Sequence, residues 1–292
     1  MEKDKMQKNK KQEEVWTTEI KPSSGLFDID FKELIRYKDL WALFVKRDII
    51  TQYKQTVLGP LWFIVQPILT TIMQFVVFSG IANIDTDGLP PALFYLSGNV
   101  IWLYFASCLT NTSSTFTSNA GVFGKVYFPR LIVPLATVTS NLLRFGIQLL
   151  LFVAFYLYFI FTGYSIAPNI YVLLVPILIL MLAGLGLGFG IVISSMTTKY
   201  RDLSILFAFF VQLWMYATPV VYPMSFITNE TLLAVMWMNP LTPIFEAFKF
   251  ATMGQGEFTW LGLGYSFGFM IVLLGLGIVV FNKVQRSFMD TV

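Results

Sequence analysis

The residue types that most enzyme active sites need are scarce in this chain. Its 292 residues include no histidine and one cysteine, Cys108, which lies in an apolar run. A Ser–His–Asp or Cys–His nucleophile, a Cys/His metal site and a disulfide therefore cannot be built from this chain alone. Asp85 and Asp87 form an acidic pair without a basic or histidine companion, which is typical of a loop turn. No catalytic or metal-ligating residue is predicted.

Arg144 is the residue with the most unusual position, because it lies inside an apolar stretch. A charge at the centre of a membrane helix costs on the order of 2.5 to 3.5 kcal/mol on insertion scales, so it should face a partner or water. Thr137, Asn141 and Gln148 share its helical face. No acidic residue is available in the apolar stretches to neutralise it. The pattern predicts a polar face that is in contact with water.

Two other apolar stretches carry polar residues at helical spacing. They are Ser107, Asn111, Ser114 and Ser118 in one stretch, and Gln66, Thr70 and Gln74 in the other. Three such stripes suggest a hydrated path between helices. The alternative is that these side chains form interhelical hydrogen bonds that only hold the bundle together, each typically worth less than about 2 kcal/mol.

The surrounding composition is that of a membrane protein. Hydrophobic residues make up 56% of the chain and charged residues 13%, about half the charged fraction of a soluble domain. Residues 1–54 hold 12 of the 20 Lys and Arg and 10 of the 17 Asp and Glu. The net charge is +3, and the basic residues lie at predicted membrane edges, so they indicate orientation and not nucleic-acid binding.

Six apolar stretches follow Gly59, each long enough to cross roughly 30 Å of hydrocarbon. They are residues 60–81, 92–115, 135–161, 171–196, 203–222 and 260–281. We therefore expect an all-α membrane protein with six transmembrane helices. The loops and flanking regions on one side hold 18 Lys and Arg, and those on the other hold one, Lys249. Because basic residues concentrate on the cytoplasmic side, both termini are predicted to be cytoplasmic.

The predicted organisation has three parts. Residues 1–27 read as a disordered cytoplasmic tail, since they lack the apolar core of a signal peptide. Residues 28–58 read as an amphipathic helix capped by Asp30, lying flat on the inner membrane surface or packed on a cytoplasmic partner. Residues 59–292 form the six-span domain.

Residues 223–259 are too long for a plain loop and too short for two more spans. A pair of short re-entrant helices on the outer side is expected between the fifth and sixth spans. Asn239 is predicted to cap the second of them, with Pro240 as its first residue. Glu246 and Lys249 lie three residues apart, so they can pair on one face of this helix.

Five segments carry a resemblance to a known family. They are RDIITQYKQTVLGPLWFIVQP (47–67), SNAGVFGKVYFPRLIVP (118–134), KYRD (199–202), TPVVYP (218–223) and NPLTPIFEAFKFATMG (239–254). In collinear order over about residues 35–290, the chain resembles the permease subunit of type-2 ABC exporters. More narrowly, it is similar to the O-antigen, teichoic acid and capsule polysaccharide exporters. Lys249 departs from the family pattern, in which Arg is more usual.

The resemblance implies the transmembrane subunit of an ATP-driven exporter in the bacterial cytoplasmic (inner) membrane. Its substrate would be an undecaprenyl-linked polysaccharide, and its partners a second copy of itself, two copies of an ABC ATPase subunit and membrane lipid. ATP and magnesium would bind to the ATPase, so no cofactor is expected in this chain. The sequence agrees, because it contains no G-x-x-x-x-G-K-[ST] motif.

The polar stripes and the resemblance together assign roles to residues. Residues 118–130 would contact the ATPase, with Pro129 ending a short helix, although an ordinary turn explains the same segment. A minority of the aromatic rings could line a path over which sugar rings slide, and the short outer helices would form an external gate. A surface ion pair without a gating role is the alternative for Glu246 and Lys249. The ATPase-coupling residues are Ser118, Gly121, Lys125, Phe128 and Arg130; the path residues are Asn111, Ser114, Asn141, Arg144, Gln148, Tyr104 and Phe152; the gate residues are Tyr222, Pro240, Glu246 and Lys249.

Two other classes stay open. An ATP-independent flippase or secondary transporter would usually show acids, histidines or broken helices at mid-membrane and internal repeats, and none is convincing here. A membrane-embedded glycan or lipid enzyme would need a carboxylate pair or metal ligands at one membrane face.

Overall fold

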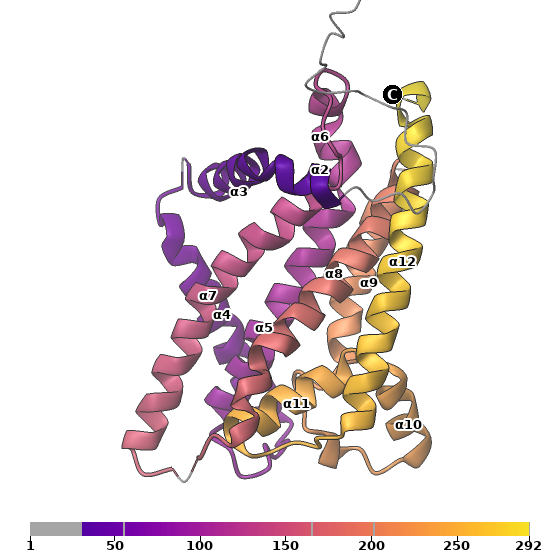
Figure 1. Ribbon diagram of the computed structural model, residues 1–292. Helices are drawn as coiled ribbons and strands as arrows, with labels where there is room; N and C mark the ends of the chain where they lie inside the picture. The colour runs from indigo at the N-terminus through magenta and orange to yellow at the C-terminus, as the bar shows by residue number, and fades with distance from the viewer. Residues whose placement is uncertain (1–30, 55, 165, 201, 292) are drawn as a thin grey trace, which may run out of the picture.

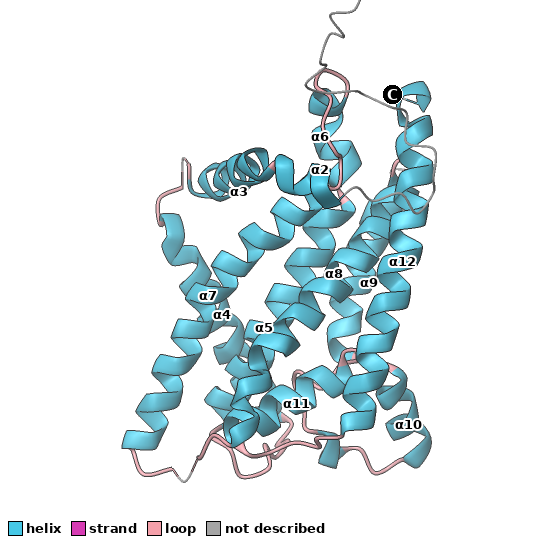
Figure 2. Ribbon diagram, viewed as in Figure 1, coloured by secondary structure: helices cyan, strands magenta, loops and turns pink. Residues whose placement is uncertain are grey.

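The computed structural model of the chain describes residues 31–54, 56–164, 166–200 and 202–291. The predicted tail at 1–27 and the predicted cap at Asp30 lie outside these residues. In the described part of the chain all regular secondary structure is helical, which confirms the predicted all-α class (Figure 2).

The longer helices follow one another with short connections. They are α2 (Phe31–Arg36), α3 (Lys38–Tyr53), α4 (Trp62–Gln74), α5 (Pro91–Ser113), α6 (Thr115–Phe123), α7 (Ile132–Phe161), α8 (Val175–Thr197), α9 (Leu203–Tyr216), α10 (Glu230–Met238), α11 (Thr242–Met253) and α12 (Trp260–Thr291). A 3₁₀ turn at Gly59–Leu61 leads into α4, and a π-helical segment at Phe75–Ile81 extends it; two further 3₁₀ turns lie at Ile170–Leu174 and Met224–Phe226.

Five helical segments of the described chain are long and apolar enough to cross a membrane. They are Gly59–Ile81, Pro91–Ser113, Ile132–Phe161, Ile170–Thr197 and Trp260–Gln285. These five match predicted spans.

The remaining predicted span, 203–222, is shorter than expected. Its helix α9 has 14 residues and ends at Tyr216. The prediction that this helix continues to Tyr222 is therefore wrong. The physical reason is Pro219, since a proline disfavours helical geometry in the residue before it. At 1.5 Å per residue, α9 is about 21 Å long, below the roughly 30 Å of the hydrocarbon layer.

The helices form one elongated bundle (Figure 1). α3 lies across one end of the bundle, and α6 and the last turns of α12 project at this same end. α10 and α11 lie at the opposite end. The predicted pair of short helices between the last two spans is therefore present. The helix predicted at 28–58 is, within the described residues, two helices, α2 and α3, which are joined at Tyr37 and end at Tyr53. Its position at the membrane interface stays a prediction.

α5 is the central helix, and α8 packs tightly against it. Gly186 and Gly190 of α8 face α5, where an added Cβ would lie 2.7 Å from Cys108 and 2.5 Å from Thr112. The glycines that alternate with them in α8, Gly184 and Gly188, face α12 in the same manner. Close approach of helices through small residues is typical of membrane bundles. The glycines of α8 thus have a packing role.

Candidate functional site

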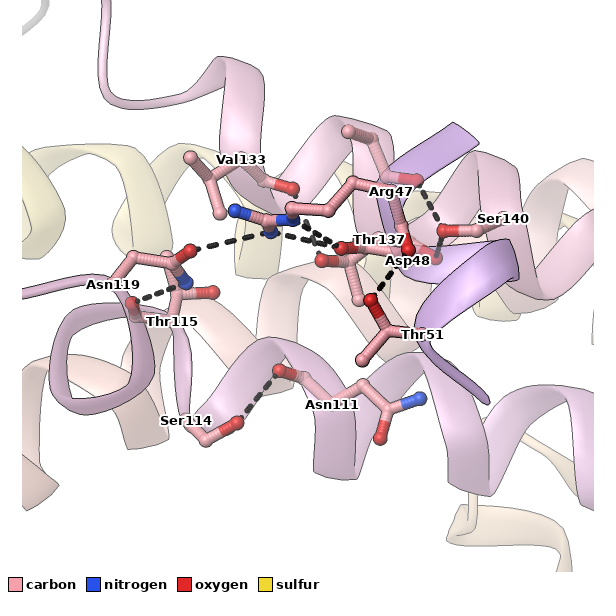
Figure 3. Close-up of polar contacts among 11 residues, drawn as sticks. Arg47, Asp48, Thr51, Asn111, Ser114, Thr115, Asn119, Val133, Thr137 and Ser140 are labelled. Carbon is pink, nitrogen blue, oxygen red and sulfur yellow. Dashed lines mark hydrogen bonds and ion pairs between the residues drawn. The ribbon is translucent and has the colours of Figure 1, made fainter. Parts of the chain in front are cut away.

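A polar cluster, which we call the inner polar cluster, lies where α3 crosses the bundle. Figure 3 labels Arg47, Asp48, Asn111 and Asn119 of it. We define it as Arg47, Asp48, Asn111, Asn119, Asn141 and Arg144. Arg47 of α3 pairs with the Asp48 carboxylate at 2.8 Å and donates to the Asn119 side-chain oxygen of α6 at 3.3 Å. α3 is thereby connected to α6, the helix that the resemblance assigns to ATPase coupling.

The deeper part of the inner polar cluster joins α5 to α7. Asn111 Nδ2 donates to Asn141 Oδ1 at 3.2 Å, so two of the predicted path residues are in contact. Asn141 is 1% exposed, and its side chain lies beside the Cys108 thiol. Arg144, one turn further along α7, has a buried Nε that lacks an acceptor within the described residues. A buried donor without a partner is unusual in folded proteins.

Arg144 is half-buried and lies level with the start of α4. Its guanidinium carbon is 5.6 Å from the centre of the Phe63 ring, a cation–π distance, and Phe63 is the second residue of α4. The carboxylate of Asp48 is close enough to act electrostatically on Arg144. The expectation that no acid is available to Arg144 is correct for the spans but misses Asp48 on the crossing helix.

The other predicted path residues have different surroundings. Ser114 is half-buried at the end of α5, and its hydroxyl donates to the Asn111 carbonyl oxygen at 3.0 Å. Gln148 is 7% exposed. The Tyr104 ring packs on Phe145 with centres 4.9 Å apart.

Phe152 is also part of the packed core. It is 3% exposed and Tyr104 is 2% exposed. Neither ring lies on the surface of the chain, so the structure gives both rings a packing role. Their contact with sugar rings stays a prediction.

The polar stripe predicted for the first span is used for packing. The Asn99 side-chain amide of α5 donates to Gln74 Oε1 at 2.7 Å and to Thr71 Oγ1 at 3.1 Å. All three residues are buried. The interhelical hydrogen-bond interpretation is confirmed for Gln74 alone, since Thr70 donates to the Gln66 carbonyl oxygen within α4 and Gln66 is exposed. Thr71 was not recognised in the sequence because it is offset by one residue from the stripe.

The predicted coupling segment projects from the bundle as α6 and the loop that follows it (Figure 1). The prediction that Pro129 ends its helix is wrong, because α6 ends at Phe123 with Gly124 as its C-cap. Ser118, Gly121 and Lys125 are exposed.

Two predicted coupling residues hold the segment in place. Phe128 is buried, and its ring centre lies 5.6 Å from that of Phe44 on α3. Arg130 donates to the Gln285 carbonyl oxygen of α12 at 2.9 Å, and burial lowers the pKa of its guanidinium. Sequence reasoning missed Val126 and Tyr127, which are 60% and 56% exposed beside Lys125. Exposed apolar residues on a projecting segment suit a protein contact.

The opposite end of the bundle contains a buried ion pair. Lys249 Nζ lies 3.1 Å from Glu246 Oε1, as the spacing predicted, and both side chains are at most 3% exposed. Lys249 also donates to the Pro219 carbonyl oxygen at 2.6 Å and lies over the Phe94 ring of α5. The interpretation as a surface ion pair is therefore wrong, because α5 and the turn after α9 cover the pair.

Asn239 has a different role from the predicted helix cap. α11 begins at Thr242, so the prediction that Asn239 caps it and that Pro240 is its first residue is wrong. The Asn239 side chain accepts from the Leu241 N–H at 3.1 Å, which closes a turn ahead of α11, and its amide donates to the Ala217 carbonyl oxygen at 2.7 Å. It ties the turn after α9 to the segment before α11.

The remaining predicted gate residues lie in the same region. The Tyr222 hydroxyl donates to the Tyr216 carbonyl oxygen at 2.6 Å, and Pro240 is buried. On α5, Gly98 leaves room for the turn, because an added Cβ would lie 2.7 Å from the Val220 carbonyl oxygen. The turn at 217–222 is thus held by α5, α11 and the segment before α11.

In the part of the chain that the structure describes, no three His, Cys, Asp or Glu residues are grouped closely enough to hold a metal ion.

Comparison with known proteins assigns this architecture to one family. The profile of the ABC-2 type transporter family matches residues 39–253. The O-antigen export system permease protein RfbA of Klebsiella pneumoniae is 28% identical over 254 residues, which are 86% of this chain and 94% of that protein. The polysialic acid transport protein KpsM of Escherichia coli is 24% identical over 86% of this chain and 95% of its own length. The capsule polysaccharide export inner-membrane protein CtrC of Neisseria meningitidis is 24% identical over 87% of this chain and 94% of its own length.

Proposed function

Because the chain belongs to the ABC-2 type transporter family, we propose that it is the transmembrane subunit of an ATP-driven exporter. Its substrate is a lipid-linked polysaccharide that crosses the bacterial cytoplasmic membrane. The substrate class is supported by the names of the relatives, which export O-antigen, polysialic acid and capsule polysaccharide. The observation that carries the proposal is that the sequence similarity extends over almost the whole length of each relative.

Arg144 is the group that we assign to the substrate. A lipid-linked glycan carries phosphate between its lipid and its sugar, and a guanidinium binds phosphate oxygens through two parallel hydrogen bonds. Within the described residues Arg144 Nε has no acceptor, and the side chain as a whole is half-buried. Phosphate oxygens would supply acceptors to this guanidinium. Asn111 is exposed and bonded to Asn141, so it joins the same polar cluster.

A second copy of the chain completes the path, and two ATPase subunits drive it. Asn111 is exposed and Arg144 half-buried in a single chain, so a path enclosed on all sides would require a symmetric partner. The exposed residues Lys125, Val126 and Tyr127 at the projecting tip form the docking surface for the ATPase. Movement of α6 would reach α3 through the Arg47–Asn119 hydrogen bond and the Phe44–Phe128 contact.

Purified alone in lipid, the chain is expected to hydrolyse ATP no faster than background, because it lacks a phosphate-binding loop. Hydrolysis should appear only with a copurifying ATPase subunit. The double variant Lys125→Glu, Tyr127→Ala should recover much less of that subunit, whereas Lys199→Glu, which reverses another exposed charge of the same predicted side, should recover as much as the parent. Appreciable hydrolysis by the homogeneous chain would contradict an exporter subunit without its own nucleotide site.

We propose that α9 and the turn at 217–222 together make the sixth crossing. α3 and the end of α12 lie at the same end of the bundle, which requires an even number of crossings (Figure 1). The basic residues of the loops place that end in the cytoplasm. The opposite end, with α10 and α11, then lies on the outer side, where these helices form the external gate.

This orientation predicts which positions react with a membrane-impermeant thiol reagent added from outside. In a Cys108→Ala background, cysteines at the exposed positions Asp85 and Gln255 should be labelled in intact cells. Cysteines at Lys125 and Lys199, also exposed, should be labelled only after the membrane is opened. Labelling of the Lys199→Cys variant from outside would rule out the six-crossing arrangement.

A further inference from the structure

A groove of about 580 Å³ runs between α3 and α7 at the inner end of the bundle. A single face of α3 supplies all of its lining except Thr139 of α7. The floor is fixed by a direct bond, since Trp41 Nε1 donates to Thr139 Oγ1 at 3.2 Å. The volume falls within the roughly 300–1,000 Å³ of typical small-molecule sites. The groove is separate from the inner polar cluster, because none of the cluster residues lines it.

The lining combines an apolar interior with two positive charges. Trp41, Val45 and Ile49 supply most of the apolar surface. Lys38 and Lys46 line the same groove eight residues apart on one helix face, about 12 Å along the axis. Both lysines are exposed, and within the described residues neither has an acidic side chain as a partner.

The position of the groove determines what can occupy it. In the proposed orientation α3 lies at the inner boundary of the bilayer, where anionic headgroups attract nearby Lys and Arg. A second copy of the chain is a poorer match, because pairing the same face of two copies would bring four lysines together. The charge of the groove therefore matches a lipid of the inner leaflet.

We propose that the groove between α3 and α7 is a binding site for one anionic phospholipid, whose acyl chain lies along Trp41, Val45 and Ile49 and whose phosphate lies between Lys38 and Lys46. This site rests on the proposed orientation but not on export, since binding needs no ATPase and no polysaccharide. Lipid in the groove ties α3 to α7. The joint between the crossing helix and the bundle would then depend on the lipid composition of the membrane.

The test uses the purified full chain in detergent. Native mass spectrometry counts retained phosphatidylglycerol, and the thermal unfolding midpoint is measured with phosphatidylglycerol, with phosphatidylcholine of the same acyl chains, and with inorganic phosphate. We expect one phosphatidylglycerol per chain and a raised midpoint with this lipid only, because a ligand that binds the native state stabilises it. Equal effects of phosphatidylcholine, or an effect of inorganic phosphate alone, would overturn the proposal.

Variants separate a built site from general attraction to anionic lipid. The double variant Lys38→Gln, Lys46→Gln should weaken phosphatidylglycerol binding at least about tenfold, given roughly 1 kcal/mol per basic residue near an anionic surface. Lys32→Gln with Lys54→Gln removes the same charge from exposed residues outside the groove and should have little effect.

Shape is tested with charge held constant. Ala42→Phe places a ring in the groove and should also displace the lipid, whereas Leu43→Phe, on the adjacent exposed position outside the groove, should not. Two results would overturn the proposal. One is equal lipid retention in the lysine double variant and its control. The other is a lysine double variant that loses the dimer but keeps the lipid, which would make the groove an interface between copies. The thiol-labelling experiment tests the orientation separately.

Discussion

Replacing Lys249 by Met is expected to destabilise the outer end of the bundle severely, because it leaves the Glu246 carboxylate buried without its positive partner. Removing one member of a buried ion pair typically costs about 3–5 kcal/mol. The Pro219 carbonyl oxygen also loses the donor that holds the turn after α9. The measurement is the thermal unfolding midpoint in detergent, together with the amount of protein in the membrane.

A second variant keeps this prediction testable if the first fails to accumulate. Glu246→Gln combined with Lys249→Met removes both charges and should recover part of the lost stability, whereas Lys199→Met, at an exposed lysine, should resemble the parent. A Lys249→Met protein as stable as the parent would show that the ion pair does not hold this end of the bundle.

Export by the Arg144→Gln variant is expected to fall at least about tenfold, since hydrogen bonds to charged groups are worth about 1.5–3 kcal/mol. Arg144→Lys should be intermediate, because it keeps the charge but loses the planar fork that contacts two phosphate oxygens. Export is measured as polymer delivered to the outer face, normalised to the amount of the chain in the membrane.

The control for Arg144 separates substrate contact from packing. Lys199→Gln removes an exposed cytoplasmic charge outside the cluster and should export normally. Both Arg144 variants should recover the ATPase subunit as well as the parent does. Loss of export in proportion to loss of membrane level would make Arg144 a packing residue, and normal export by a well-expressed Gln variant would leave its charge without a transport role.

Local patterns in the sequence were sufficient for much of the fold. Long apolar stretches identified five spans, because backbone hydrogen bonding within lipid requires complete helices. The spacing of Glu246 and Lys249 identified their pairing. These features depend on residues that are near one another in the chain.

Features that depend on distant contacts were not visible in the sequence. Asp48 lies near Arg144 because α3 folds back across α7, which no periodicity within either helix shows. Asn239 resembles a helix cap, but its side chain is engaged by the turn after α9. The burial of the Glu246–Lys249 pair likewise comes from α5 and the turn at Pro219. Tertiary packing decided these three roles.

The most direct test of polysaccharide export removes the chain from its host cell and follows the polymer. We expect surface polysaccharide to be lost and lipid-linked polymer to accumulate on the cytoplasmic face, as measured by fractionation and by access to an externally added glycosidase. Restoring the parent chain should return the polymer to the surface, and restoring Arg144→Gln to the same membrane level should not. Unchanged surface polysaccharide in cells without the chain would contradict its role as the exporter's membrane subunit.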